Sequence, residues 1–305
     1  MNRRDFFTAA TAPLALATIS SVASPVPVVA QASLGRLNKQ GIAGRGLLGP
    51  NLSLEDQCRQ AQELGITGFE FSMPNEWPTM KKYGIVCSMY RLNDPMAPAD
   101  ARAGSGRPGW NQIGSKEAMG EFLKAFHEGI DLAASNGVPN MILLAGSSSP
   151  TLSREQGADN AVAFCNAVKA HAEDRGVTLC MEYINSKGIQ GGLLGLFDRM
   201  AWGVDVITRV SSPRVKILYD IFHAQIMEGF VVQTIRDNFK HIGHFHTGGV
   251  PGRHELDETQ ELNYRFIAQA IADLGYQGFV THEWGATQGK NPVEMLKKSM
   301  AIINV

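Results

Sequence analysis

The feature that most constrains this fold is an alternation, repeated eight times, of a short apolar run with a longer segment of helical periodicity. Such an alternation is typical of βαβ units that build a parallel sheet. The predicted strands cover residues 41–48, 66–73, 85–92, 140–145, 177–185, 215–222, 242–247 and 278–284. The predicted helices cover residues 53–64, 76–83, 116–135, 153–175, 193–210, 231–240, 262–274 and 292–303. Eight such units in a chain of 305 residues predict an α/β protein closed into a (β/α)8 barrel, or TIM barrel.

Local signals support these boundaries. Ser53 is a suitable N-cap for the first helix, Gly65 can end it in a left-handed conformation, and Pro292 fits the first position of the last helix. An open doubly wound sheet is the alternative, because residues 44–49 match the GxGxxG spacing of a dinucleotide-binding loop. No clear apolar strand precedes that motif, however, and Pro50 follows it where a helix should begin. The barrel is therefore the favoured fold.

The first 32 residues have the composition of an export signal. Arg3 and Arg4 precede an apolar, alanine-rich stretch, and residues 30–32 form a small-x-small cleavage site. The arginine pair resembles a twin-arginine signal, and the apolar stretch is too short to span a membrane. We expect cleavage after Ala32, a periplasmic protein without a membrane span, and a single barrel domain over residues 33–305. The alternative is an uncleaved amphipathic tail or a lipid-side anchor.

Composition excludes several classes of function. The formal net charge is −1, so there is no basic excess with which to bind a nucleic acid. No two of the four cysteines have CxxC spacing, which argues against a zinc knuckle or a redox motif and favours buried free thiols. The sequence also lacks a GxSxG motif and a P-loop. We expect a small-molecule substrate as the partner, and a chain that can form a homo-oligomer.

Metal-capable side chains end four consecutive predicted strands. Glu182 ends the fifth strand, Asp220 the sixth, His246 the seventh and Glu283 the eighth. The chemistry of a barrel lies at the carboxyl ends of its strands, and an acid there is costly unless it is paired or bound to a metal. Three carboxylates and one imidazole favour Mn²⁺ or Mg²⁺, with Co²⁺, Fe²⁺ or Zn²⁺ as alternatives. The long loop at residues 93–114 is a candidate lid.

Further polar residues near strand ends are candidates for substrate binding: His223, Arg253, His254, Lys187 and Glu70. Arg253 could pair with a substrate carboxylate through two hydrogen bonds, and the alternative is a salt bridge within its loop to Glu255 or Asp257. His223 could donate to a substrate oxygen or be satisfied by packing. His244 shares the inward face with His246 but lies deeper, so we expect it in the core or behind the metal ligands.

At these residues the chain resembles the hydroxypyruvate isomerase family, within the xylose-isomerase-like TIM-barrel superfamily. The resemblance extends from about residue 41 to the C-terminus and is most specific from Glu182 onward. The matching segments are residues 181–185, 219–229, 242–244, 250–255, 261–264 and 275–278.

The resemblance implies a ligand set of Glu182, Asp220, His246 and Glu283. It also implies that His223 and Arg253 contact the substrate, as residues at these positions do in related sugar epimerases. A histidine at position 246 is the ligand type of those epimerase relatives, whereas close hydroxypyruvate isomerases are expected to have glutamine there.

The resemblance further implies a metal-dependent isomerase with Glu182 and Glu283 as the catalytic residues. Its expected reaction interconverts a small hydroxy-carbonyl compound, of the hydroxypyruvate and tartronate semialdehyde kind, by proton transfer through an enediolate. A ketose 3-epimerase or keto-sugar dehydratase is the first alternative, and an exported binding protein without catalysis is the second. An abasic-site endonuclease would need a multi-zinc cluster and a basic groove, which this sequence does not offer.

Overall fold

The computed structural model describes residues 37–49, 51–93, 111–189 and 195–305. All of them belong to one compact unit, Ser33–Val305. The predicted signal and its cleavage site lie outside the described residues, as does most of the candidate lid at residues 93–114. Within the described part of the chain, no helix is both long enough and apolar enough to cross a membrane.

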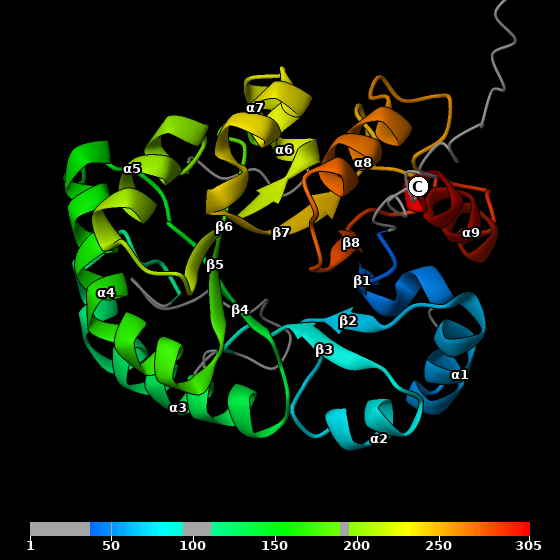
Figure 1. Cartoon of the computed structure of the whole chain (residues 1–305), viewed down its shortest axis with the longest axis horizontal. Helices are drawn as coiled ribbons and strands as arrows, with labels where there is room; N and C mark the ends of the chain where they lie inside the picture. Colours follow the sequence, from blue (N-terminus) through cyan, green and yellow to red (C-terminus); the bar gives the residue numbers. More distant parts are fainter. Residues whose placement is uncertain (1–36, 50, 94–110, 190–194) are drawn as a thin grey trace, which may run out of the picture. The chain divides into compact units, whose positions relative to one another are not determined.

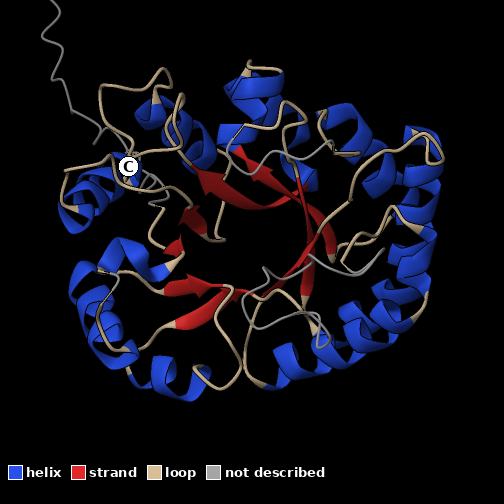
Figure 2. Ribbon diagram, turned by 180° about the vertical axis from the view of Figure 1, so that it is seen from behind, coloured by secondary structure: helices blue, strands red, loops and turns tan. Residues whose placement is uncertain are grey.

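Eight parallel strands form a ring, and helices surround it (Figure 1 and Figure 2). The strands are β1 (Gln40–Ala43), β2 (Gly68–Glu70), β3 (Val86–Met89), β4 (Asn140–Leu143), β5 (Thr178–Glu182), β6 (Val215–Asp220), β7 (Ile242–Thr247) and β8 (Val280–His282). Neighbours in the sheet follow the order β3-β2-β1-β8-β7-β6-β5-β4. A parallel bridge between Tyr90 and Met141 brings the chain after β3 beside β4. The predicted TIM barrel is confirmed.

Apart from α6, which the sequence analysis did not predict, and the start of α5, the helices begin and end close to where the sequence signals predict. They are α1 (Leu54–Leu64), α2 (Trp77–Lys82), α3 (Glu121–Ser135), α4 (Arg154–Arg175), α5 (Met200–Val210), α6 (Ile221–Met227), α7 (Val231–Asn238), α8 (Tyr264–Asp273) and α9 (Pro292–Ile303). The Ser53 hydroxyl accepts a hydrogen bond from the Asp56 amide at 3.1 Å, which caps α1. Gly65 ends α1 at a φ of 80°, and Pro292 occupies the first turn of α9.

Every predicted strand except residues 242–247 is longer than the observed strand, and two of them end early for different physical reasons. Arg45–Leu48 is a 3-10 helix rather than the end of a strand, because Leu47 and Leu48 bury their side chains in the core. This short helix also removes the geometry that a dinucleotide-binding loop needs. The sixth strand ends at Asp220 because that side chain accepts hydrogen bonds from the two amides that start α6.

The fifth predicted helix begins too early. Residues 195–199 form a loop that packs against the core, and α5 starts only at Met200. Leu196 and Phe197 are fully buried in this loop. The Arg154 guanidinium donates to both carboxylate oxygens of Asp198, at 2.6 and 2.9 Å, and to the Leu196 carbonyl oxygen at 2.9 Å. These contacts fix the segment that follows β5.

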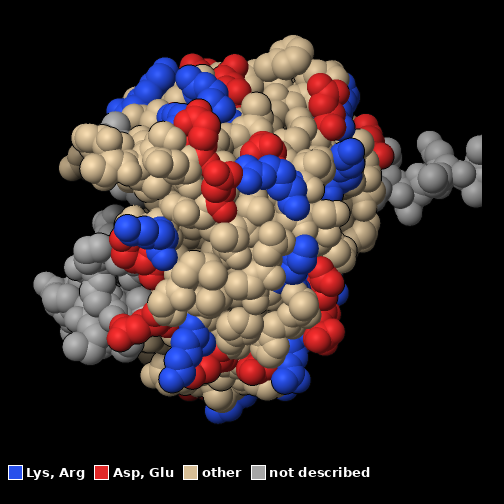
Figure 3. All heavy atoms as spheres, turned by 90° about the vertical axis from the view of Figure 1, so that its left-hand side faces the viewer, with Lys and Arg blue, Asp and Glu red and all other residues tan. Residues whose placement is uncertain are grey.

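Most of the buried apolar side chains form one cluster that includes residues of both the strands and the surrounding helices. A smaller cluster is made of buried side chains from four neighbouring strands: Met89, Ile142, Cys180 and Leu218. All four cysteines are buried free thiols, as predicted. The face in Figure 3 carries acidic and basic side chains interspersed, which agrees with the small net charge.

Replacing Arg154 by Met should lower the free energy of unfolding by about 3 kcal/mol, because Asp198 is left buried without its cation. The exposed pairs of Arg209 with Asp159 and Asp205 make Arg209→Met the matched control, with an expected loss below about 1 kcal/mol. Both values come from urea unfolding followed by circular dichroism.

The effect of Arg154→Met depends on pH in a known direction. Burial opposes ionisation of Asp198, but the charge and hydrogen bonds of Arg154 lower the pKa of Asp198 below its ordinary value. The pair therefore stabilises the fold fully above the pKa of an aspartate in the unfolded chain, about 3.9, and this contribution is lost as the pH falls from there through the lower pKa of Asp198 in the folded protein. A difference between the two proteins that stays constant down to pH 3 would contradict this account.

Candidate active site

Four neighbouring strands bring the predicted ligand set together at their carboxyl ends. Glu182 and Asp220 are the last residues of β5 and β6, His246 is next to last in β7, and Glu283 follows β8. Asp220 lies opposite His246 in the register of β6 and β7. Each of the four residues offers one ligand atom, and these atoms all lie within 4.8 Å of one another. The strand order thus assembles residues that are a hundred positions apart.

The imidazole of His246 is the centre of this cluster. Its Nδ1 atom lies 2.6 Å from Glu283 Oε2, 3.6 Å from Glu182 Oε1 and 3.9 Å from Asp220 Oδ2. The ring is fully buried, and among the described residues its Nδ1 makes no hydrogen bond of acceptable geometry. One imidazole nitrogen and three carboxylate oxygens that converge on one point are a suitable set of ligands for a divalent cation. These four residues therefore fit a metal ion.

The two carboxylate oxygens of Asp220 have different roles: one caps a helix, and the other faces the site. Oδ1 accepts hydrogen bonds from the amides of Phe222 at 2.8 Å and His223 at 3.3 Å, which caps α6. Oδ2 faces the cluster, 2.7 Å from an Nη2 atom of Arg253. The cap fixes the direction of the side chain, so that the second oxygen needs no further support to point at the centre of the site.

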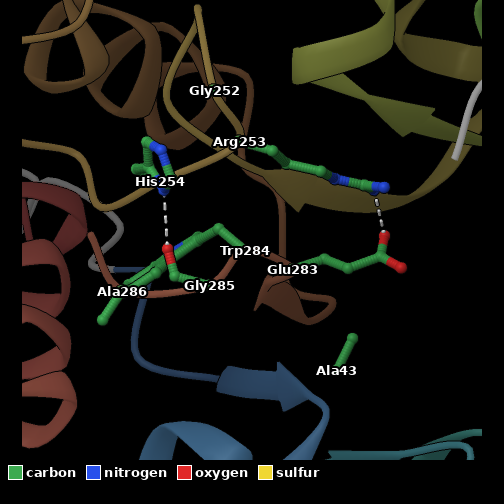
Figure 4. A pocket seen from close by; sticks show the side chains of 8 residues that line it. All are labelled: Ala43, Gly252, Arg253, His254, Glu283, Trp284, Gly285 and Ala286. Carbon is green, nitrogen blue, oxygen red and sulfur yellow. Dashed lines mark hydrogen bonds and ion pairs between the residues drawn. The ribbon is translucent and has the colours of Figure 1, made fainter. Parts of the chain in front are cut away.

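Arg253 reaches into the cluster from the loop after β7, as Figure 4 shows. Its Nη2 atom donates to Asp220 at 2.7 Å and to Glu283 at 2.8 Å, and its guanidinium lies over the Phe222 ring at 5.1 Å. The backbone at Arg253 has a φ of 50°, which turns the side chain inward. The alternative of a salt bridge within the loop is wrong. Arg253 pairs with Asp220 and Glu283, and the two loop acids, Glu255 and Asp257, pair with Lys290.

The surroundings push the pKa values of the two catalytic candidates in opposite directions. Burial raises the pKa of Glu182, and the neighbouring charges of Glu283 and Asp220 add to this. Burial also opposes ionisation of Glu283, but the positive charges of His246 and Arg253 lower its pKa to about 2. Burial lowers the pKa of His246, and the charges of Glu70 and Glu283 outweigh it and raise that pKa. Glu283 is therefore the ionised carboxylate of the pair.

A cavity of about 380 Å³ lies beside the cluster, lined by Arg253, His254, Glu283 and Trp284 among others (Figure 4). The His254 Nδ1 atom lies 3.1 Å from the Gly285 carbonyl oxygen, which ties the loop after β7 to the chain after β8. A small hydroxy-carbonyl compound fits in this volume. His254 is thus placed at the wall of the cavity.

His223 lies against the ligand set, with its Nε2 atom 3.5 Å from Asp220 Oδ2. Asn185 orients this ring, because its amide nitrogen donates to His223 Nδ1 at 2.7 Å and leaves the proton on Nε2. Sequence reasoning missed Asn185. The signal was present, since it is a polar residue just past the end of a buried strand.

Two residues predicted to bind substrate, Glu70 and Lys187, are not among those that line the cavity. Glu70 was predicted to contact substrate, but it is buried, and its two oxygens lie 2.6 Å from His244 Nε2 and 2.9 Å from His246 Nε2. The correction follows from its place on β2, from which its side chain meets these histidines. His244 is in the core behind His246, as expected. Lys187 is exposed in the loop after β5, and its substrate role stays a prediction.

Three carboxylates and one imidazole at the ends of β5 to β8 of a TIM barrel define a class of barrel enzymes with a candidate metal centre at the strand ends. The chain belongs to the xylose isomerase-like TIM barrel family, whose model matches residues 58–304. The predicted superfamily is confirmed.

The relatives agree on the class of reaction. A putative hydroxypyruvate isomerase of Homo sapiens is 31% identical over 245 residues, covering 72% of this chain and 80% of that protein. A 2-oxo-tetronate isomerase of Pectobacterium atrosepticum is 23% identical over 248 residues, covering 79% and 90%. A D-psicose 3-epimerase of Ruminiclostridium cellulolyticum is 31% identical over 149 residues, covering 46% and 47%. The predicted isomerase is confirmed at the level of this class.

The solved structures support the fold. A 3-keto-D-glucoside 4-epimerase from E. coli superposes with a TM-score of 0.68 at 18% identity, covering 87% of this chain and 98% of that one.

Asp220→Asn separates metal binding from folding. The amide oxygen can keep the cap on α6, whereas the amide nitrogen that replaces Oδ2 cannot bind a cation. We expect the affinity for Mn²⁺ to fall at least about tenfold by isothermal titration calorimetry, with an unchanged circular dichroism spectrum. Asp205→Asn, at an exposed acid of α5, should bind Mn²⁺ like the wild type. Equal affinities for both variants would remove Asp220 from the ligand set.

Proposed function

We propose that this protein is a metal-dependent isomerase of a small hydroxy-carbonyl compound of the hydroxypyruvate and tartronate semialdehyde kind. The observation that carries the proposal is the pair Glu182 and Glu283. Both belong to one ligand set, Glu182 at the end of β5 and Glu283 after β8, and their pKa values are shifted in opposite directions. One carboxyl group with a lowered pKa and one with a raised pKa are suited to the removal and the return of a proton at adjacent carbons. Export to the periplasm through residues 1–32 is also part of the proposal.

In the proposed reaction Glu283 is the base, because its pKa leaves it ionised at neutral pH. It removes a proton from the hydroxymethyl carbon beside the substrate carbonyl, and the electron pair of that C–H bond forms the double bond of an enediolate. Glu182 then returns a proton to the former carbonyl carbon, and a proton moves between the two substrate oxygens. When the product leaves, Glu283 gives its proton to solvent and Glu182 takes one up, which restores both side chains. Glu182, Asp220, His246 and Glu283 would hold a divalent cation, which would supply a Lewis acid to stabilise the negative charge of the enediolate.

Other residues of the chain hold the substrate and the charges in place. His223 presents its Nε2 proton beside Asp220 and can donate it to a substrate oxygen. Arg253 keeps Glu283 ionised and closes one side of the cavity. Trp284 lines the same cavity and limits the access of water to the reacting carbons.

Single Gln variants test the two-carboxylate scheme. With saturating Mn²⁺ and metal content checked, Glu182→Gln and Glu283→Gln should each lower turnover by about 10²–10⁴-fold. The two should differ in solvent exchange. In D₂O, Glu283→Gln loses exchange at the hydroxymethyl carbon, whereas Glu182→Gln keeps that exchange and loses product formation. If both variants turned over like the wild type with metal bound, the scheme would be wrong.

A ketose 3-epimerase, or a keto-sugar dehydratase, is the second candidate. The observation that favours it is the pairing of Arg253 with both Asp220 and Glu283 at 2.7 and 2.8 Å. Because this guanidinium nitrogen already donates to two acids of the protein, the site suits a neutral sugar better than a substrate that carries a carboxylate. The similarity to a D-psicose 3-epimerase adds support.

A screen by NMR in D₂O with Mn²⁺ or Mg²⁺ distinguishes the candidates. The isomerase predicts deuterium in a carboxylated substrate, beside its carbonyl, and conversion to the aldehyde isomer. The epimerase predicts deuterium at C3 of a neutral ketose instead. Absence of exchange in every compound would contradict both and support an exported binding protein.

A further inference from the structure

Behind the ligand set lies a second group of buried polar side chains, for which the proposed reaction has no use. Glu70 comes from β2, His244 from β7 and Thr281 from β8. The side chains of Glu70 and His244 are both 0% exposed, and Thr281 is equally buried. Burying a carboxylate costs free energy, which is offset only when hydrogen bonds satisfy its oxygens.

The hydrogen-bonding partners of this group fix where the ring protons lie. Glu70 Oε1 is 2.6 Å from His244 Nε2, and Glu70 Oε2 is 2.9 Å from His246 Nε2. An ionised carboxylate only accepts hydrogen bonds, so both Nε2 atoms must carry a hydrogen. When His246 has a single ring proton, that proton is therefore on Nε2, and Nδ1 has a free electron pair.

The free electron pair points at the other three ligands. His246 Nδ1 lies between 2.6 and 3.9 Å from oxygens of Glu283, Glu182 and Asp220. The opposite tautomer would place a proton on Nδ1 and an unprotonated Nε2 against the carboxylate of Glu70. That arrangement would both block metal binding and repel the buried acid.

We propose that Glu70 is a positioning residue, which holds the proton of His246 on Nε2 and so makes Nδ1 the metal-binding nitrogen. This inference rests on the metal site of the proposed function. Carboxylates that accept from the second nitrogen of a ligating histidine fix its tautomer and raise its basicity, and their loss costs about 10–100-fold in metal affinity.

His244 holds Glu70 in turn. Its Nε2 atom contacts both Glu70 Oε1 and Thr281 Oγ1, at 2.6 and 3.2 Å. The rings of His244 and His246 meet edge to face, with centroids 5.2 Å apart and an angle of 85°. Because each carboxylate oxygen has its own imidazole, Glu70 cannot rotate away from His246 without losing the bond to His244.

Glu70, His244 and His246 have ligand atoms close enough to one another to form a second cation site. The distances of 2.6 and 2.9 Å are those of charge-assisted hydrogen bonds, and the positioning role needs no second ion. The two readings differ in stoichiometry, since a second site requires two cations per chain.

Two variants and one control test the positioning role. Glu70→Leu removes both acceptor oxygens at similar volume and should weaken Mn²⁺ binding by about 10–100-fold. Glu70→Gln keeps one acceptor oxygen for His246 Nε2 and should bind more tightly than Glu70→Leu. Asp198→Asn removes the charge of a buried acid outside this group and should bind like the wild type. Calorimetry gives the affinities and the stoichiometry, without any use of catalysis.

The wild-type tautomer is measured directly, so the test does not depend on the folding of a variant. In the Zn²⁺-loaded protein with ¹⁵N-labelled histidine, NMR should show His246 bound through Nδ1 and protonated at Nε2. Coordination through Nε2, two cations per chain, or wild-type affinity in Glu70→Leu would each overturn the inference. If these results agree with it while no hydroxy-carbonyl compound exchanges deuterium, the proposed reaction fails and the positioning role stands.

Discussion

Repulsion among buried carboxylates around one imidazole is the constraint on which the site depends. Glu182, Asp220 and Glu283 meet at Nδ1 of His246, and Glu70 lies at Nε2 of the same ring. Such a concentration of negative charge is unstable unless positive charge is placed within it. Arg253 supplies one such charge from the chain, and the donor set fits a divalent cation for the rest.

The barrel makes this arrangement rigid. Parallel strands in fixed register place Asp220 opposite His246, and the cap on α6 leaves one oxygen of Asp220 for the site. Residues on strands are held more precisely than residues on loops, which suits the ligands. The loop after β7 supplies the positive charge, since Arg253 pairs with Asp220 and Glu283 from that loop. Fold and charge thus support each other at the carboxyl end of the barrel.

The fold and the ligand set could be predicted from the sequence, and much of what surrounds them could not. Strand periodicity and the rule that barrel chemistry lies at strand ends led to Glu182, Asp220, His246 and Glu283. Glu70 was found but given the wrong role, because its contact with two histidines joins residues more than 170 positions apart. Distances between such residues depend on strand register and on side-chain rotamers, and neither can be derived from the periodicity of the sequence.

The central claim is that these four residues hold one divalent cation through a single imidazole nitrogen. Pulsed electron paramagnetic resonance of the protein with one equivalent of Mn²⁺ tests it most directly, because the spectrum counts the nitrogens bound to the metal. The account predicts coupling to one histidine nitrogen, which is lost in His246→Ala. Coupling to no nitrogen or to two, or coupling that survives in His246→Ala, would contradict it.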